Sequence, residues 1–409
     1  MTIPEARLPE ALRAGFDTSQ DLVVSTQRIR SELGHQETVP RAEAIRRTIE
    51  WERANSPGEI ELAELTIHWK MPSCAVRSAL KAYWVPTCIS SSPGSCWGGE
   101  LLKSTDQRAV ELLRAARKLG MEVEDIQVLA DAGNLIARLL PYPIVARVST
   151  LFGDEDPVYW RNVLAREVKV SLHLKQQGVP VVVPTNEANP GPHPVGDTWF
   201  SLWEYVPPVH LSDPSPHEAL HLLRGLEAGM LTYPGALPLL GAWAPVSEFM
   251  AQLLKTDDKD IRSLAEFWRT VDRQLSGIPG EQLTAAHGDA HLGNLIPGPS
   301  GWLWTDFEDS SLMPKFWDLA AAVGRTFLLG EARGTSESLI RGVLGEQPDG
   351  EQLRAFSLAL AARAILSISS NLALALHGHS DLVLARRRLD NGLKLLEQLC
   401  SGQTSLPWH

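Results

Sequence analysis

Long hydrophobic runs and a secretory leader are both missing from this 409-residue sequence. The best candidate for a membrane span, 358–368, is far shorter than the roughly 20 residues required and contains Arg363. The N-terminus lacks a basic start followed by an apolar run and a small-residue cleavage site. We therefore expect a cytoplasmic protein that does not associate with a membrane.

Cysteine is scarce, and positive charge is outnumbered. Four cysteines are too few and too unevenly placed for a disulfide framework. Zinc binding by His68 with Cys74, Cys88 and Cys96 is disfavoured because no C-x-x-C pair is present. The formal net charge of −11 argues against a nucleic-acid partner, which would need a basic face. Nothing in the sequence indicates an oligomeric state.

The chain is too long for one ordinary domain, and its patterning changes along its length. We predict a helical segment over 1–60, an irregular linker over 61–103, a small mixed lobe over 104–208 and a larger helical lobe over 209–409. Apolar periodicity predicts strands at 126–130, 135–140, 144–150, 179–183 and 199–205, and helices at 39–54, 161–177, 217–230, 245–275 and 351–399.

Walker A, serine-hydrolase and dinucleotide fingerprints are absent, but one polar motif stands out. The pattern H-x-D-x-x-x-x-N is formed by His287, Asp289 and Asn294, and Asp306 follows twelve residues later. Protein kinases use this order for a base that accepts the hydroxyl proton and for two magnesium ligands. Taken singly, each of these residues is better explained by a cap or a turn, but together they favour a nucleotide site.

The segment between the last two motif residues has the pattern strand, turn, strand, with PGPSG at its centre. Such a hairpin would bring Asp306 back beside Asn294. Magnesium prefers hard oxygen ligands and keeps several waters, so one amide oxygen and one carboxylate are sufficient protein ligands. We therefore predict that Asn294 and Asp306 bind Mg²⁺.

The sequences HGDAHLGN and DFEDSSLMPKFWDLA closely resemble the aminoglycoside phosphotransferase and choline kinase family. The resemblance extends more weakly over about 104–400. It implies an α+β, bilobal protein-kinase-like fold, preceded here by the helical and irregular extension. It also implies ATP and Mg²⁺ as cofactors, and transfer of the γ-phosphate to a hydroxyl of a small molecule, whether aminoglycoside-like, choline-like or another metabolite.

The resemblance assigns roles to the motif residues. Asp289 would be the catalytic base, His287 would brace the loop, and Asn294 and Asp306 would hold the metal. Asp318 would be structural.

Further roles concern the nucleotide. Arg147 would grip the ATP phosphates, and Glu167 would be its ion-pair partner. A loop containing Gly133 and Asn134 would cover the phosphates, although an ordinary hairpin turn explains this loop equally well. The adenine-binding hinge would consist of Glu204, Tyr205 and Val206.

Three alternatives remain open. The chain could be a pseudokinase, a binding module without catalysis. His217, Glu218 and His221 form an H-E-x-x-H pattern typical of zinc metalloproteases, although Arg224 and Glu227 do not fit its extended form. Residues 26–54 resemble the C-terminal tail of extended short-chain dehydrogenase/reductase sugar epimerases, without the glycine-rich cofactor turn.

The acceptor is not determined by any motif. Glu308 and Asp309 form an acidic pair after Phe307. We hypothesise that this pair faces a cationic acceptor.

Overall fold

The computed structural model describes Arg47 and residues 105–132, 134–149, 157–331, 333–377 and 380–400. The chain divides into two compact units, Met1–Met71 and Pro72–His409. Arg47 is helical and exposed, and it is the one described residue of the first unit. The rest of the predicted helix over 39–54, the epimerase-like stretch over 26–54, the linker with its cysteines and His68, and Gly133 lie outside the described residues. The four predicted segments and the boundaries between them stay predictions.

A five-stranded antiparallel sheet forms the first part of the described fold. Its order is β1-β2-β3-β5-β4, and the predicted strands at 126–130, 135–140, 144–150 and 199–205 are four of its members. Aliphatic and β-branched residues dominate the central strands, as suits a sheet buried on both faces. The elements are α4 (Thr105–Lys118), β1 (Asp125–Ala132), β2 (Asn134–Leu140), β3 (Ile144–Ser149), α5 (Pro157–Gln176), β4 (His193–Val195) and β5 (Thr198–Glu204).

The two faces of this sheet are covered by different helices. Side chains alternate along a strand, so Ile144 of β3 lies on one face, where it packs in a cluster with Leu112 of α4. Val145 lies on the other face and packs in a cluster with Val168 of α5. Arg147 shares the parity of Val145, so the alternation directs its side chain to the α5 face.

The predicted strand at 179–183 is not a strand. Val181 forms a single bridge with Trp304, and Pro184 forms another with Trp203. Pro180 and Pro184 bracket the segment, and proline cannot donate to a ladder, so pairing stops at these isolated bridges.

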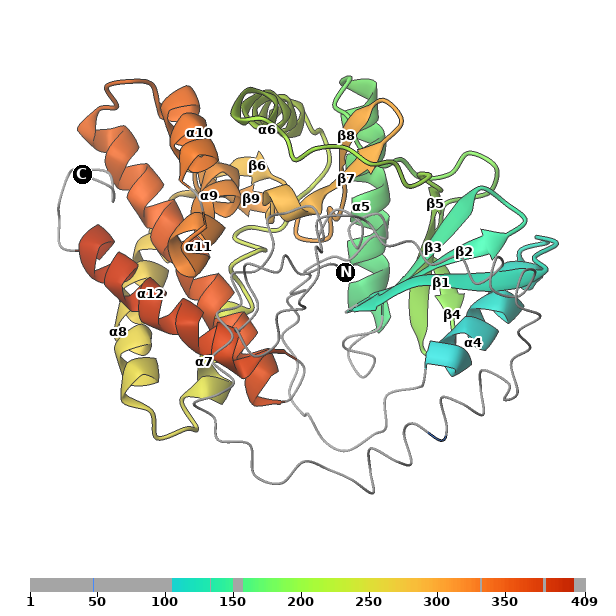
Figure 1. The fold of residues 1–409 in the computed structure, drawn as a ribbon, viewed down its shortest axis with the longest axis horizontal. Coiled ribbons are helices and arrows are strands. Elements are labelled where there is room, and N and C mark those ends of the chain that lie inside the picture. The colour runs from blue at the N-terminus through green and yellow to red at the C-terminus, as the bar shows by residue number, and fades with distance from the viewer. Residues whose placement is uncertain are drawn as a thin grey trace, which may run out of the picture. The chain divides into compact units, whose positions relative to one another are not determined.

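The helical lobe is built around α11 (Gly350–Leu376), which packs against α7, α8, α9 and α12. Figure 1 shows these helices on one side, the five-stranded sheet on the other, and α5 with the hairpin β7–β8 between them. The remaining elements are α6 (Pro216–Leu231), α7 (Val246–Leu253), α8 (Lys259–Ser276), η3 (Gly280–Gln282), β6 (Thr284–Ala286), η4 (Leu292–Asn294), β7 (Leu295–Gly298), β8 (Gly301–Trp304), β9 (Ser311–Met313), α9 (Trp317–Leu329), α10 (Gly334–Leu344) and α12 (Leu382–Cys400).

Two long predicted helices are each divided in the structure. The pattern at 245–275 forms α7 and α8, because Asp258 accepts hydrogen bonds from the N–H groups of Asp260 and Ile261 and so begins a new helix. The pattern at 351–399 forms α11 and α12, which lie against each other. Apolar periodicity persisted across both breaks because each pair of helices presents its apolar face to the same core.

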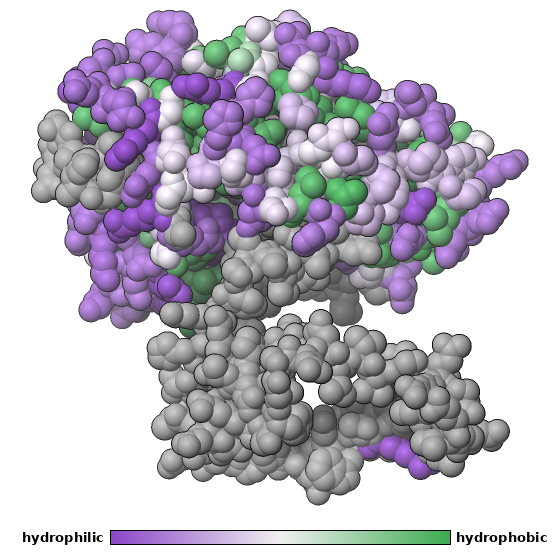
Figure 2. All heavy atoms as spheres, turned by 45° about the horizontal axis from the view of Figure 1, so that its top comes forward, coloured by the Kyte–Doolittle hydropathy of each residue, from purple (hydrophilic) through white to green (hydrophobic). Residues whose placement is uncertain are grey.

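Helix α11 is long and apolar enough to cross a membrane by length and composition alone. However, 78% of its most apolar window is buried inside the fold. This burial is typical of a core helix. On the face shown in Figure 2 the described surface is mainly hydrophilic, and apolar side chains form smaller, separate patches.

Candidate active site

The motif loop runs from His287 to Asn294, between β6 and β7. Asp318, at the start of α9, accepts hydrogen bonds from the backbone N–H groups of His287 (2.8 Å) and Gly288 (3.1 Å). Gly288 has φ +91, and a Cβ added there would lie 2.1 Å from the carbonyl oxygen of Asp309. The loop geometry therefore requires glycine at this position.

His287 is fully buried and links the loop to the segment after β8. Its Nδ1 lies 3.2 Å from the backbone nitrogen of Asp289 and must accept a hydrogen bond from that N–H. Its Nε2 lies 3.1 Å from the carbonyl oxygen of Thr305 and must donate to it. These two partners assign the neutral Nε2–H tautomer. His287 therefore braces the loop rather than facing an open site.

The Asp289 carboxylate is held by cations and amides. Arg363 of α11 forms an ion pair with Oδ1, and Oδ2 lies 3.4 Å from Nε2 of His291 and 3.3 Å from Nδ2 of Asn294. Burial alone would raise the pKa of Asp289, but the charges of His291 and Arg363 outweigh it and lower the pKa to about 2. Asp289 is therefore ionised at every physiological pH.

The predicted hairpin is present and brings Asn294 next to Asp306. Strands β7 and β8 pair, and the N–H of Thr305 donates to the carbonyl oxygen of Asn294 at 3.0 Å. The Asn294 side chain donates through Nδ2 to the carbonyl oxygen of Asp289 at 2.9 Å. Its Oδ1 is buried and has no hydrogen-bond partner among the described residues. Asp306 has a left-handed backbone conformation, with φ 71.

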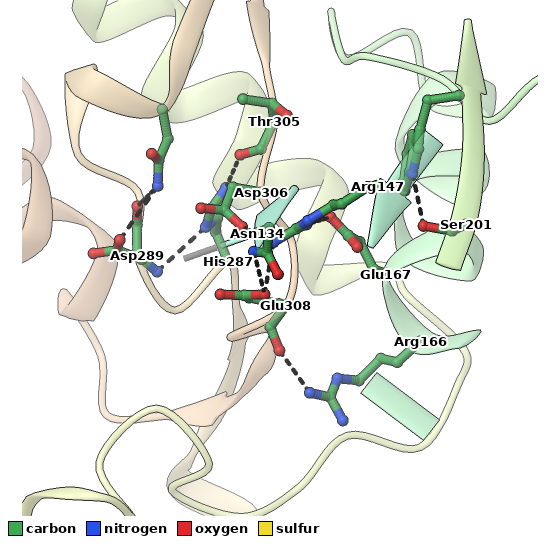
Figure 3. A network of polar contacts seen from close by, with 12 residues as sticks. Asn134, Arg147, Arg166, Glu167, Ser201, His287, Asp289, Thr305, Asp306 and Glu308 are labelled. Carbon is green, nitrogen blue, oxygen red and sulfur yellow. Dashed lines mark hydrogen bonds and ion pairs between the residues drawn. The ribbon is translucent and has the colours of Figure 1, made fainter. Parts of the chain in front are cut away.

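One arginine joins the sheet to the motif segment. Arg147 of β3 is fully buried and forms an ion pair with Glu167 of α5, the partner expected from the sequence. The same guanidinium lies 2.7 Å from Asp306 and 2.6 Å from Glu308. Figure 3 shows these side chains converging from both lobes. We refer to Arg147, Glu167, Asp306 and Glu308 as the arginine cluster.

The arginine cluster is rich in carboxyl groups. It contains three of them against one guanidinium. Burial raises the pKa of Glu167 to about 7, although Arg147 opposes the shift. Burial also raises the pKa of Glu308 well above its ordinary value, and the neighbouring carboxylate of Asp306 adds to this effect. The two glutamates therefore carry less than their full negative charge near neutral pH.

Other predicted nucleotide residues lie around the arginine cluster or at the end of the sheet. Asn134, at the start of β2, is buried and donates to Glu308 at 3.4 Å. Glu204 ends β5, and its N–H donates to the carbonyl oxygen of Val183, while the N–H of Tyr205 donates to Pro143. Two of the three backbone donors of the predicted hinge are thus already used within the fold. Val206 follows them directly, where the chain leaves the sheet.

For Glu308 the structure contradicts the hypothesis that the acidic pair faces a cationic acceptor, and for Asp309 it stays a hypothesis. Glu308 is buried in the arginine cluster, and its carbonyl oxygen accepts a hydrogen bond from Arg166 at 2.6 Å. Glu308 lies two residues after Asp306 in the sequence. The left-handed backbone at Asp306 and the ion pair with Arg147 place the Glu308 carboxylate beside β3.

The H-E-x-x-H segment is the start of α6. Glu218 forms a capping box with Ser215, whose N–H donates to the Glu218 carboxylate at 3.0 Å. His217 and His221 are exposed. The described residues contain no group of three metal-binding side chains of histidine, cysteine, aspartate or glutamate. The cap accounts for Glu218 without zinc.

The sequence analysis missed the role of Arg363, which contacts Asp289 from α11 across 74 residues of chain. A single charge within an apolar helix was the available signal, because arginine is rarely buried without a partner.

Residues 116–356 match the model of the phosphotransferase enzyme family (APH). The chain belongs to this family. Like other members it is a small-molecule phosphotransferase, and its α+β fold is protein-kinase-like. No curated protein matches this phosphotransferase in sequence.

Solved structures resemble this phosphotransferase at low sequence identity. LicA in complex with AMP is 15% identical, with a TM-score of 0.52, covering 72% of this chain and 100% of its own. The amicoumacin kinase hAmiN in complex with AMP-PNP, Ca²⁺ and Ami is 16% identical, with a TM-score of 0.51, covering 71% and 94%. A choline/ethanolamine kinase family protein from Mesorhizobium loti is 17% identical, with a TM-score of 0.48, covering 72% and 95%. The first two likenesses, with TM-scores above 0.5, establish the fold.

Proposed function

We propose that this phosphotransferase uses ATP and Mg²⁺ to transfer the γ-phosphate to a hydroxyl group of a small molecule. The proposal depends chiefly on one observation. Asn294 Oδ1 is buried and has no hydrogen-bond partner among the described residues. In the β7–β8 hairpin, the carbonyl oxygen of Asn294 accepts a hydrogen bond from Thr305, the residue before Asp306. An orphaned buried amide oxygen costs about 1–3 kcal/mol. A metal ligand role explains why the fold retains it.

The chemistry of the donor set fits magnesium. Asn294 offers an amide oxygen and Asp306 offers a carboxylate, both hard ligands of the kind that Mg²⁺ binds together with ATP phosphates. When bound, Mg²⁺ would neutralise charge on the phosphates and hold them in position. Arg147 is held beside Asp306 by its ion pairs with Asp306 and Glu308.

Arg147 is the residue that we assign to the ATP phosphates, with Glu167 as its positioning partner. A guanidinium suits phosphate because it can donate two parallel hydrogen bonds. Asn134 and the adjacent Gly133 are assigned to the loop over the phosphates. Adenine would bind at Glu204 to Val206, and Val206 is the favoured backbone donor because the N–H groups of the two residues before it are engaged.

Asp289 is the residue that we assign to the acceptor hydroxyl. The hydroxyl oxygen forms a bond to the γ-phosphorus, the bond from that phosphorus to the bridging oxygen of ADP breaks, and the hydroxyl proton passes to Asp289. A carboxylate with a pKa of about 2 is a weak base. Its main contribution is therefore to orient the hydroxyl, which is sufficient because phosphoryl transfer proceeds through a loose transition state.

The similar structures support the nucleotide assignment. LicA was solved with AMP, and hAmiN was solved with AMP-PNP and Ca²⁺. Both have TM-scores above 0.5 to this chain, so the same fold accommodates an adenine nucleotide.

Thermal unfolding with and without Mg-ATP tests the proposal, because a ligand that binds only the folded state stabilises it. At 100 times its Kd, Mg-ATP would add about 2.7 kcal/mol. We expect magnesium-dependent stabilisation of the natural protein, loss of it in Asp306→Asn, and no loss in Asp390→Asn, which changes an exposed aspartate of α12. Equal stabilisation of all three proteins would contradict the assignment of Asp306.

The pseudokinase alternative is separated by turnover. It predicts stabilisation by Mg-ATP without ADP release in the presence of any hydroxyl compound. Asp289→Asn should then bind Mg-ATP like the natural protein. If the proposal holds, the natural protein releases ADP with a suitable acceptor. Asp289→Asn then loses at least about a hundredfold in kcat, because the hydroxyl is no longer oriented and its proton has no carboxylate to receive it.

A further inference from the structure

The surroundings of Asp289 indicate the chemical class of the acceptor. We propose that the acceptor carries an anionic group, such as a carboxylate or a phosphate, close to the hydroxyl that is phosphorylated, and that Arg363 binds this group. The inference rests on the proposed function, because it takes Asp289 as the residue that orients the hydroxyl.

Arg363 lies against the carboxylate that an acceptor hydroxyl must approach. A hydroxyl that donates to the Asp289 carboxylate must approach Oδ1 or Oδ2. Oδ1 is bound by Arg363, and Oδ2 has His291 and Asn294 within 3.4 Å. Two groups that share one carboxylate lie only a few ångströms apart, so the acceptor hydroxyl is placed beside the guanidinium.

Arg363 is held in position by contacts within the protein, before any acceptor binds. Its Nη1 donates to the carbonyl oxygen of Gly288 at 3.0 Å, and its guanidinium carbon lies 5.5 Å from the ring centre of Trp317. The Trp317 indole N–H donates to the same carbonyl oxygen at 2.7 Å. A guanidinium held on several sides loses little entropy when it binds an anion.

Arg363 also has a hydrogen-bond donor, Nε, that is buried and has no partner among the described residues. Both of its terminal nitrogens are engaged, with Gly288 and with Asp289. The side chain is only 10% exposed. A buried guanidinium N–H without a partner is costly, and an anionic oxygen is its best complement.

Charge in the neighbourhood is mixed. The positive charges of Arg325 and Arg363 act on His291, and so do the negative charges of Asp289 and Asp306. Arg325 is paired with Glu331 at 3.0 Å, and Arg363 forms an ion pair with Asp289. An amine near the reacting hydroxyl would face Arg363, and like charges in a buried site repel strongly. The site therefore selects against the cationic acceptors that the sequence suggested.

The test uses two matched series of hydroxyl compounds that differ mainly in charge. The first is glycerate, glycerol and 3-aminopropane-1,2-diol, and the second is glucuronate, glucose and glucosamine. ADP release with Mg-ATP gives kcat/KM for each compound, and mass spectrometry identifies the phosphorylated product. The proteins are the full chain, Arg363→Gln, Arg363→Lys and the control Arg354→Gln, an exposed arginine on the same helix.

We expect the anionic member of at least one series to exceed its neutral partner by about tenfold or more, and the cationic member to be the poorest. Arg363→Gln should reduce this ratio of anionic to neutral acceptor toward one. Arg363→Lys should keep part of it, and Arg354→Gln should keep all of it. The ratio is the decisive readout because a purely structural role of Arg363 would lower turnover of all acceptors equally.

Preference for the neutral or cationic member, or a ratio unchanged in Arg363→Gln, would overturn the inference. So would stabilisation by Mg-ATP together with no turnover of either anionic compound at millimolar concentration. If Mg-ATP fails to stabilise the natural protein, the proposed function itself is refuted, and the inference falls with it. If Arg363→Gln fails to fold, the acceptor preference of the natural protein and of Arg363→Lys decides.

Discussion

Glu227 offers the most direct test of how the helical lobe supports the catalytic loop. It lies on α6, partly buried, and burial raises its pKa to about 7, with the negative charge of Asp318 adding to the shift. Asp318 is the residue that binds two N–H groups of the loop. Replacing Glu227 with Gln removes the charge while keeping the shape, so it should relieve this repulsion.

The sign follows from proton linkage. Because the pKa of Glu227 is higher in the folded protein than in the unfolded chain, the folded protein binds the proton more tightly, and stability falls as pH rises from about 4.5 to about 7. Each pKa unit corresponds to about 1.4 kcal/mol, which sets an upper limit of about 3 kcal/mol. Solvent screening of this partly exposed group lowers our expectation to about 1–2 kcal/mol.

Urea denaturation at pH 5 and pH 8.5 measures the effect. The natural protein should lose stability between these values, but Glu167 and Glu308 also contribute to that loss because burial raises their pKa values too. The informative quantity is therefore the difference between Glu227→Gln and the natural protein. We expect this difference to grow by about 1–2 kcal/mol toward pH 8.5. Parallel pH profiles for the two proteins would refute the reasoning, and Glu266→Gln, an exposed change on α8, serves as the control.

Three further predictions concern stability and turnover. Arg147→Met should destabilise the fold by about 3–5 kcal/mol in urea denaturation, because it leaves three buried carboxylates without their cation; unchanged stability would contradict the cluster. Gly288→Ala should abolish turnover in the ADP-release assay, since its Cβ would clash with a backbone carbonyl at 2.1 Å. Gly392→Ala should cost about 1–3 kcal/mol in thermal unfolding, because its Cβ would lie 2.2 Å from Ile368, whereas Gly225→Ala, with nothing within 4 Å, should be neutral or stabilising.

Much of the motif segment could be predicted because its contacts are local. The hairpin between Asn294 and Asp306 needs only a turn and two short strands, and the structure contains it. The ion pair of Arg147 with Glu167 was expected from family resemblance and is present. The roles of these residues in catalysis remain predictions.

Errors arose where long-range packing competes with local pattern. The segment 179–183 has the composition of a strand, but prolines on both sides limit it to isolated bridges. Apolar periodicity ran through two helix breaks because consecutive helices share one core. A pattern in the sequence reports which face is buried, but it does not report where the chain turns.

The sequence by itself determined the family, the hairpin between Asn294 and Asp306, and the spacing of Asp289, Asn294 and Asp306. Only the tertiary structure placed Arg363 on Asp289 and turned Glu308 into the arginine cluster, away from an acceptor. The physical reason is that charge complementarity acts through space. A buried carboxylate is paired with whichever cation the fold brings to it, and that cation comes from α11 or β3, which the linear pattern does not connect to the loop.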